Sequence, residues 1–330
     1  MTPEKTERTH LTRGYSIALV SAVILSTTAI FIRYLTQTYQ LPALVLAFWR
    51  DLFVSASLLL ILRSFRPALL APGGHLRYLF AYGLALSIFN SLWTLSVALN
   101  GAAVSTVLAY SSAAFTALLG WWFLKEPLHW AKVTAVALGL AGCVLVAGAL
   151  DPAAWRVNTI GILTGILSGL MWAIYSLMGR SASQRGLNPW TTLLYTFGIA
   201  ALCLLAFNLA FGCFLPGAAT RPADLFWLGE AWLGWGILFL LGVGPTLAGF
   251  GLYNVALTRL PSSVANLIAT TEPVFTAAIA YFFLGERLTW VQVGGSMMIL
   301  GGVVLLRVYE GWMEKQARLD NLLTRMGHTS

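Results

Sequence analysis

Two short segments of this sequence place ionisable side chains inside long apolar stretches. Arg50 and Asp51 stand side by side within residues 42–62. A charge at the centre of a membrane costs roughly 2.5–3.5 kcal/mol on insertion scales, so such a group faces a wet cavity or the protein interior. We expect Arg50 to face a cavity, where it binds a substrate carboxylate or pairs with Glu272. The alternative is that Arg50 joins helices through backbone carbonyls. Since neighbouring helix positions point apart, Arg50 and Asp51 are not expected to share one partner.

Glu272 offers a different chemistry, because it precedes Pro273 within residues 262–284. Proline frees a carbonyl one turn earlier and disfavours helix at the preceding residue. A carboxyl group beside such a break can take up a proton in a coupled cycle or bind a substrate amine. The alternative is that Glu272 only satisfies the broken backbone. Glu126 and Glu286 lie instead at the ends of apolar stretches, where capping or loop anchoring is expected.

Aromatic residues form a stripe on one predicted helix. His75, Tyr78, Tyr82, Phe89 and Trp93 recur at helical spacing and therefore share a face. We assign Tyr82 and Trp93 to a cavity wall. His75 and Tyr78 are assigned to a gate, or alternatively to the interfacial aromatic belt. Ordinary packing is the other explanation for such a stripe.

Other polar and aromatic side chains complete the candidate cavity. Ser112 is one of them, and close helix packing is the alternative explanation for this serine. The buried amides Asn90 and Asn254 need hydrogen-bond partners. Gly244 and Pro245 within residues 232–256 predict a kink that acts as a hinge. The cavity residues added by this reasoning are Ser112, Trp172, Tyr175 and Asn254.

The sequence offers little for catalysis or metal binding. Its three cysteines have no ligand spacing, and its four histidines form no H-x-x-x-H pair. Only Asp51 is a clear aspartate within an apolar stretch, whereas an intramembrane aspartyl enzyme needs two. We therefore predict no catalytic residues, no metal site and no cofactor.

The composition explains what positions these residues. Only 10% of the 330 residues are charged and 58% are hydrophobic, whereas soluble chains carry about a quarter charged residues. Stretches of about 20 apolar residues span a bilayer as helices. Residues 1–14 are polar and contain no cleavable signal, so the first span is expected to be a permanent anchor. The ten predicted spans are 15–35, 42–62, 76–97, 102–123, 131–150, 158–178, 190–211, 232–256, 262–284 and 291–307.

Basic residues predict the orientation of these spans. With the N-terminus in the cytoplasm, fifteen Lys and Arg residues lie on the cytoplasmic side and four on the other, a clear positive-inside bias. Both terminal tails, 1–14 and 308–330, are then cytoplasmic. The net charge of +8 is spread over loops without interleaved aromatic residues, so nucleic acid is not an expected partner.

The sequence also repeats itself. "FLKEPLHW" at 123–130 matches "FLGERLTW" at 283–290 in five of eight letters, at an offset of 160 residues. The repeat divides the chain into 15–150 and 151–307, each with five spans. Because five is odd, the second half enters the membrane from the opposite side. Inverted repeats of this kind are typical of transporters with a midplane site; an old duplication kept only for stability is the alternative.

Residues 253–306, with the run "EPVF" and the later "LGE", resemble the C-terminal repeat of EamA-type members of the drug/metabolite transporter superfamily. Residues 46–60 and 93–146 resemble the first repeat, and the resemblance covers 15–307. It implies ten helices, a bacterial-type inner-membrane location and export of small metabolites, often amino acids. Within the family, the chain also bears a weaker resemblance to the aromatic amino-acid exporter branch. The chain departs from the pattern in its first half, where Ser112-Ala113 stand at the position that corresponds to Glu272-Pro273 of the second half. No proline break is therefore expected in the fourth span.

Together these observations predict an all-α polytopic membrane protein of ten transmembrane helices in two inverted five-helix repeats. We expect a secondary transporter that exports small metabolites, amino acids foremost, by alternating access. A multidrug or other metabolite exporter, a channel or sensor, and an intramembrane enzyme are the alternatives. The expected partners are a small-molecule substrate and the lipid bilayer. The oligomeric state is left open and is compatible with a monomer.

Overall fold

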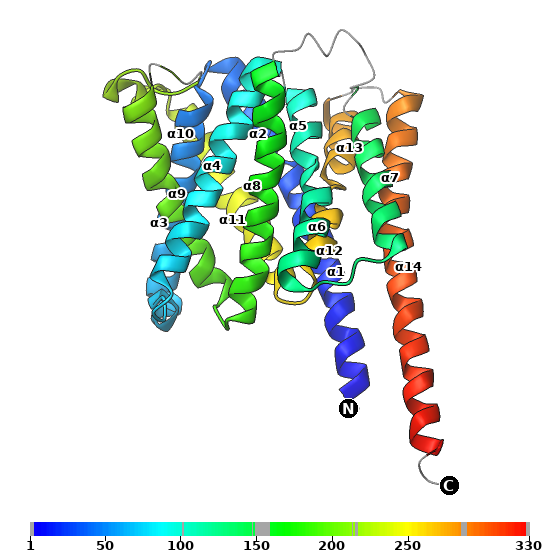
Figure 1. Cartoon of the computed structure of the whole chain (residues 1–330). Coiled ribbons are helices and arrows are strands. Elements are labelled where there is room, and N and C mark those ends of the chain that lie inside the picture. Colours follow the sequence, from blue (N-terminus) through cyan, green and yellow to red (C-terminus); the bar gives the residue numbers. More distant parts are fainter. Residues whose placement is uncertain are drawn as a thin grey trace.

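A computed structural model describes residues 3–100, 102–146, 148, 159–212, 214, 217–284 and 289–327, and this part of the chain is helical without strands (Figure 1). The first half contains α1 (Pro3–Ser26), α2 (Thr28–Thr38), α3 (Ala43–Phe65), α4 (Leu76–Asn100), α5 (Ala102–Tyr110), α6 (Ser112–Leu124) and α7 (Trp130–Val146). The second half contains α8 (Thr159–Gln184), α9 (Pro189–Phe211), α10 (Trp232–Leu241), a π-helical turn (Gly242–Thr246), α11 (Leu247–Leu257), α12 (Ser262–Ala269), α13 (Glu272–Leu284) and α14 (Trp290–Gly327).

The apolar helices account for the predicted spans. In the described part of the chain, eight helical segments are long and apolar enough to cross a membrane. The fifth predicted span is the shorter helix α7, of 17 residues, and the ninth is divided into α12 and α13. The protein is therefore an all-helical, multi-pass membrane protein, as its composition predicts.

Three spans are interrupted by hydroxyl-bearing residues. Span one breaks at Thr27, span four at Ser111, and span nine at Thr270 and Thr271. At each break a hydroxyl donates a hydrogen bond to the carbonyl three residues earlier, with O···O distances of 2.5–2.7 Å. Such bonds compete with the helix and bend it. No proline break was expected in the fourth span, and the helix is nevertheless interrupted there at Ser111.

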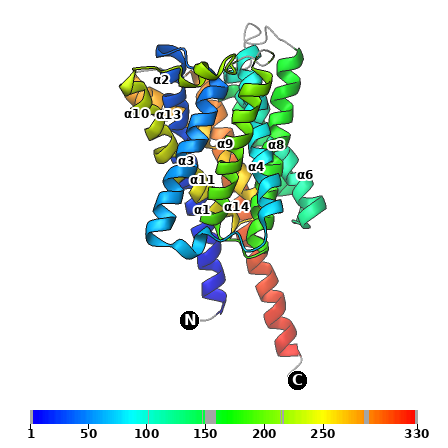
Figure 2. The same ribbon diagram turned by 90° about the vertical axis from the view of Figure 1, so that its left-hand side faces the viewer.

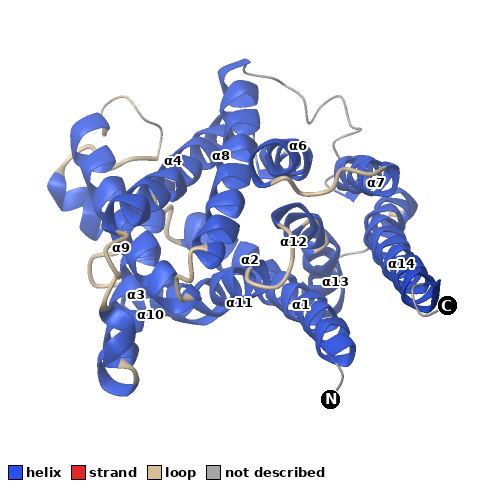
Figure 3. Ribbon diagram, turned by 60° about the horizontal axis from the view of Figure 1, so that its bottom comes forward, coloured by secondary structure: helices blue, strands red, loops and turns tan. Residues whose placement is uncertain are grey.

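Helices from the two predicted halves pack in pairs. Among the packed pairs are α1 with α11, α3 with α9, α4 with α8, α6 with α12, and α7 with α14. In terms of the predicted spans, these pairs join one to eight, two to seven, three to six, four to nine and five to ten, a set that exchange of the two halves leaves unchanged. The α7–α14 pair lies at one edge of the bundle (Figure 3). The predicted boundary at 150/151 lies outside the described residues.

Both chain termini lie at the same end of the bundle, called the terminal end below (Figures 1 and 2). The residues predicted as tails are largely helical, because α1 begins at Pro3 and α14 continues to Gly327. The loops 125–129, 185–188 and 258–261 also lie at the terminal end, whereas the segment 217–231 lies at the opposite end (Figure 1).

Candidate functional site

Arg50, Asp51 and Asn90 form a closed hydrogen-bonded ring between α3 and α4. Arg50 donates from Nε to Asp51 Oδ1 and from Nη2 to Asn90 Oδ1, and Asn90 Nδ2 donates to Asp51 Oδ2; each of these distances is 3.0 Å. All three side chains are buried. Burial of an ion pair is tolerated when its remaining polar atoms are hydrogen-bonded, and Asn90 performs that role here.

This ring corrects two sequence-based expectations. Arg50 and Asp51 do share a partner, because Asn90 accepts from one and donates to the other. Arg50 pairs with Asp51 and not with Glu272, which lies beside the Tyr110 hydroxyl and near Cys143. The second terminal nitrogen of Arg50, Nη1, has no hydrogen-bond partner among the described residues.

An aromatic cluster fills the centre of the bundle. Trp172 stacks on Tyr175 with ring centroids 5.2 Å apart and on Tyr253 at 5.5 Å. Tyr175 in turn lies 4.6 Å from Tyr82, centroid to centroid. Phe250 meets Trp172 edge-on. The predicted cavity residues Tyr82, Trp172 and Tyr175 therefore lie together.

Asn254 connects this cluster across three helices. Its Oδ1 accepts a hydrogen bond from the Tyr82 hydroxyl at 3.2 Å. Its Nδ2 donates to the Tyr175 hydroxyl at 3.0 Å and to the Phe250 carbonyl at 2.9 Å. The amide thus links α4, α8 and α11 at their crossing.

A second polar chain leads from Trp172 to the broken helices. Trp172 Nε1 donates to Asn266 Oδ1 at 3.0 Å, and Asn266 Nδ2 donates to Thr116 Oγ1 at 2.6 Å. Thr116 then donates to the Ser112 carbonyl. The Ser112 hydroxyl is buried without a partner among the described residues. Asn266, Thr116 and Tyr253 were not selected as cavity residues from the sequence, although their positions on apolar helices next to polar neighbours gave a signal.

The predicted gate and hinge residues are placed as follows. His75 lies just before α4, and Tyr78 donates to the Met178 carbonyl at 2.5 Å. The Arg185 guanidinium covers the Tyr78 ring at 4.5 Å from its centroid. Gly244 and Pro245 lie in the π-helical turn between α10 and α11. These positions join α4 to α8 at the terminal end and place an irregular turn within span eight.

Trp93 stands apart from these groups. It is half-buried on α4, and within the described residues no ring contact or hydrogen bond joins it to the aromatic cluster. The described residues also contain no group of three or more His, Cys, Asp or Glu side chains that could hold a metal ion.

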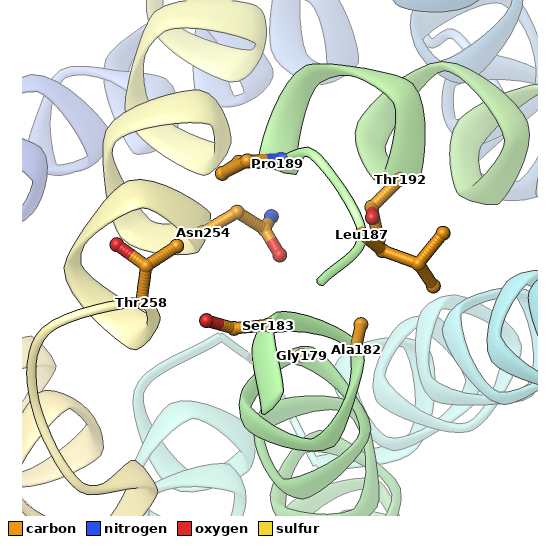
Figure 4. Close-up of a pocket in the computed structure, with 8 residues that line it drawn as sticks. All are labelled: Gly179, Ala182, Ser183, Leu187, Pro189, Thr192, Asn254 and Thr258. Carbon is orange, nitrogen blue, oxygen red and sulfur yellow. The ribbon is translucent and has the colours of Figure 1, made fainter. Parts of the chain in front are cut away.

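The terminal side of Asn254 is closed. A narrow depression at the terminal ends of α8, α9 and α11 is too small to hold a water molecule (Figure 4). Asn254 lies at its centre. The other lining residues are Gly179, Ala182, Ser183, Leu187, Pro189, Thr192 and Thr258.

Burial varies along the helices around the aromatic cluster. On α4, Tyr82 and Leu86 are fully buried, whereas Phe89 and Trp93 are half-buried. Every residue of α12 is buried, but Glu272 and the following residues of α13 are half-buried.

Comparison with known proteins agrees with this architecture. Residues 12–148 and 159–308 match the EamA-like transporter family. An uncharacterized transporter of Archaeoglobus fulgidus is 29% identical over 67% of this chain and 74% of its own length. The threonine/homoserine exporter RhtA of Salmonella typhimurium is 27% identical over 64% of each chain.

Two further proteins extend the comparison over more of the chain. A probable amino-acid metabolite efflux pump of Escherichia coli is 24% identical over 81% of this chain and 86% of its own. A solved crystal structure aligns with a TM-score of 0.73 at 17% identity, covering 92% of this chain and 99% of the other. At that identity the likeness concerns the fold alone.

Proposed function

The chain belongs to the EamA-like transporter family, and from this premise we propose that it exports small metabolites, amino acids foremost, across a bacterial-type inner membrane. A member of this family is a transporter and not an enzyme. Two relatives are named for amino acids or their metabolites. Their names support this substrate class, and the polar groups of the central region supply a reason for it.

The observation that carries the proposal is the free Nη1 of Arg50. The ring with Asp51 and Asn90 fixes the guanidinium and leaves Nη1 as a charged donor. A substrate carboxylate is the complementary ligand, since hydrogen bonds between ionised groups are shorter and stronger than neutral ones. In this proposal Asp51 and Asn90 orient Arg50, and Arg50 binds the carboxylate.

The aromatic cluster supplies the proposed wall for the remainder of the substrate. Trp172 is half-buried, so part of its ring remains available beyond its stacks on Tyr175 and Tyr253. An alkyl chain or a flat ring packs favourably on such a surface. Export of aromatic amino acids is the narrower form of the proposal, supported by this ring alone.

The proposed cycle is alternating access. The substrate binds between Arg50 and the aromatic cluster, and rocking of the two repeats exposes it to one side at a time. The π-helical turn at Gly244 and Pro245 is the proposed hinge, with His75 and Tyr78 at the gate of the terminal end. Glu272, half-buried at the start of α13, is the proposed proton carrier if a proton gradient drives export.

The test is uptake of radiolabelled amino acids by proteoliposomes, with and without an imposed pH gradient. We expect saturable uptake of several amino acids. Their decarboxylated analogues should be taken up roughly 10–100-fold less efficiently, because they lose a charged hydrogen bond. Stimulation by the gradient that disappears in Glu272→Gln would support proton coupling.

Variants of one helix provide the matched controls. Arg50→Gln should lose amino-acid uptake, whereas Arg63→Gln, which alters an exposed arginine on the same helix, should retain it. Both variants are first checked for monodispersity and thermal unfolding. If folded protein transports other metabolites but no amino acid, or transports the decarboxylated analogues equally well, the proposed substrate class is wrong.

A further inference from the structure

A buried carboxylate closes the terminal end of the bundle by capping a helix of the other half. Lys125 ends α6 with a left-handed backbone (φ 54°), which turns Glu126 back toward α12. Glu126 Oε1 accepts hydrogen bonds from Ser262 N and Ser262 Oγ, both at 2.7 Å. Its Oε2 accepts from Ser263 N at 3.2 Å and Ser263 Oγ at 2.5 Å. The capping role predicted for Glu126 is confirmed, and the capped helix belongs to the other repeat.

Two neighbours complete this contact. Lys132 is 1% exposed, and its Nζ donates to Ser263 Oγ at 3.0 Å and to the Pro127 carbonyl at 2.7 Å. Gly120 provides the space for the carboxylate, because a Cβ at that position would lie 2.9 Å from Glu126 Oε2. We call Glu126, Ser262, Ser263, Lys132 and Gly120 the latch.

The latch acts on the helix that supports the central cluster. α12 begins at Ser262 and carries Asn266, which receives the Trp172 hydrogen bond. The loop before α12 leads from Thr258, a residue that lines the closed depression of Figure 4. In the proposed cycle, opening of the terminal end separates α6 from α12 and breaks the four hydrogen bonds between Glu126 and the two serines.

The second repeat has the same glutamate without the groups that receive it. At the offset of 160 residues, Glu126 corresponds to Glu286, which lies outside the described residues. The serines correspond to Ala102 and Ala103, Lys132 to Gln292, and Gly120 to Ala280. These counterparts carry no hydroxyl group, no lysine and no glycine, so the side chains that surround Glu126 are not repeated in the second half.

We infer that this asymmetry makes the conformation closed at the terminal end the resting state of the transporter. Two symmetric repeats would give two states of equal stability, apart from their surroundings. A latch at one end lowers the free energy of the state in which that end is closed. The inference rests on alternating access as proposed above, but not on the identity of the substrate.

The test measures opening without any substrate. In a background whose three native cysteines are replaced by alanine, Ala182→Cys places a thiol in the closed depression, where Ala182 is 2% exposed. A small, water-soluble methanethiosulfonate reagent should modify this thiol slowly. In Glu126→Gln, which keeps the side-chain volume but cannot accept from both serines, the rate should rise about tenfold, equivalent to about 1.4 kcal/mol.

A control variant and a second latch variant accompany this test. Glu230→Gln removes an exposed carboxylate at the opposite end and should leave the rate unchanged. Ser263→Ala removes one latch hydroxyl and should raise the rate by a smaller factor, so it gives a reading even if Glu126→Gln does not fold. An unchanged rate in both folded latch variants, or an equal rise in Glu230→Gln, would overturn the inference.

Transplanting the latch provides the converse experiment. Ala102→Ser, Ala103→Ser, Ala280→Gly and Gln292→Lys together give the second repeat the groups of the first. A latch at the opposite end should shift the population toward the state that is open at the terminal end. Modification of the thiol at position 182 should then become faster in a transport-independent assay, and a slower or unchanged rate in the folded protein would contradict the proposal.

Discussion

At the scale of single residues, Asp224 shows how one carboxylate organises a loop outside the membrane. Its Oδ2 accepts hydrogen bonds from the Thr220 hydroxyl at 2.6 Å, the Arg221 amide at 2.8 Å and the Thr220 amide at 3.0 Å. These bonds favour the ionised form. They lower the pKa of Asp224 from its ordinary value of 3.8, with the Thr220 hydroxyl as the largest cause.

This lowered pKa predicts a loop that loosens in acid. Because the folded pKa lies below the unfolded one, the stabilisation is complete above pH 3.8 and is lost as the pH falls through the folded pKa. Hydrogen exchange of residues 217–226, corrected for intrinsic rates, should therefore accelerate below about pH 4. In Asp224→Asn this acid step should disappear; an identical step in the variant would mean that another group is responsible.

At the residue scale, the sequence predicted which side chains need partners but not which partners they take. Arg50, Tyr82, Trp172, Tyr175 and Asn254 could be selected because polar or amphipathic groups in apolar spans need partners. Which partner each one takes depends on side-chain reach and on helices distant in sequence. The hydrogen bonds that join Arg50 to Asp51 and Asn90 could therefore be identified only in the folded structure.

At the scale of helices, α7 and α14 pack through glycine. A Cβ on Gly295 would lie 2.6 Å from Leu145 Cβ and 2.7 Å from the Gly142 carbonyl oxygen. A Cβ on the neighbouring Gly294 would meet nothing within 4 Å. Substitution of each of these two adjacent glycines can therefore distinguish the effect of close packing from the general effect of glycine on helix stability.

We expect Gly295→Ala to destabilise the protein by about 1–3 kcal/mol, because the added methyl group forces the two backbones apart. Gly294→Ala should be neutral or slightly stabilising, since alanine favours helix more than glycine does. Thermal unfolding of both variants in the same detergent measures the difference. Equal shifts in the two variants would show that close packing of α7 and α14 contributes nothing to stability.

Helices as elements were largely predictable, but their interruptions were not. Apolar length and loop composition indicate where spans lie, and glycine with proline marks the irregular turn at Gly244 and Pro245. The breaks at Thr27 and Ser111 have no such signal, because serine and threonine occur within many continuous helices. Only the hydroxyl-to-carbonyl bonds in the folded chain identify them.

At the scale of the whole molecule, the distribution of charge predicts how the bundle sits in the membrane. The predicted spans assign fifteen basic residues to the side of the termini and four to the other. Since cytoplasmic loops retain Lys and Arg, the terminal end should face the cytoplasm. Segment 217–231 would then face outward.

Cysteine labelling of intact cells tests this orientation. In the cysteine-free background, a membrane-impermeant maleimide should label Glu230→Cys directly. Arg66→Cys, exposed at the terminal end, should be labelled only after the membrane is permeabilised. The reverse pattern would invert the orientation, and with it the sense in which the latch faces the cytoplasm.

The continuous helix α14 has a practical consequence for imaging. Its 38 residues form a rod of roughly 57 Å at about 1.5 Å per residue, against about 30 Å of hydrocarbon. Particles of this size buried in a detergent belt offer electron cryomicroscopy few features for alignment. A compact domain fused in helical register at Gly327 would extend that rod without a flexible joint and serve as a rigid fiducial for determining each state of the transport cycle.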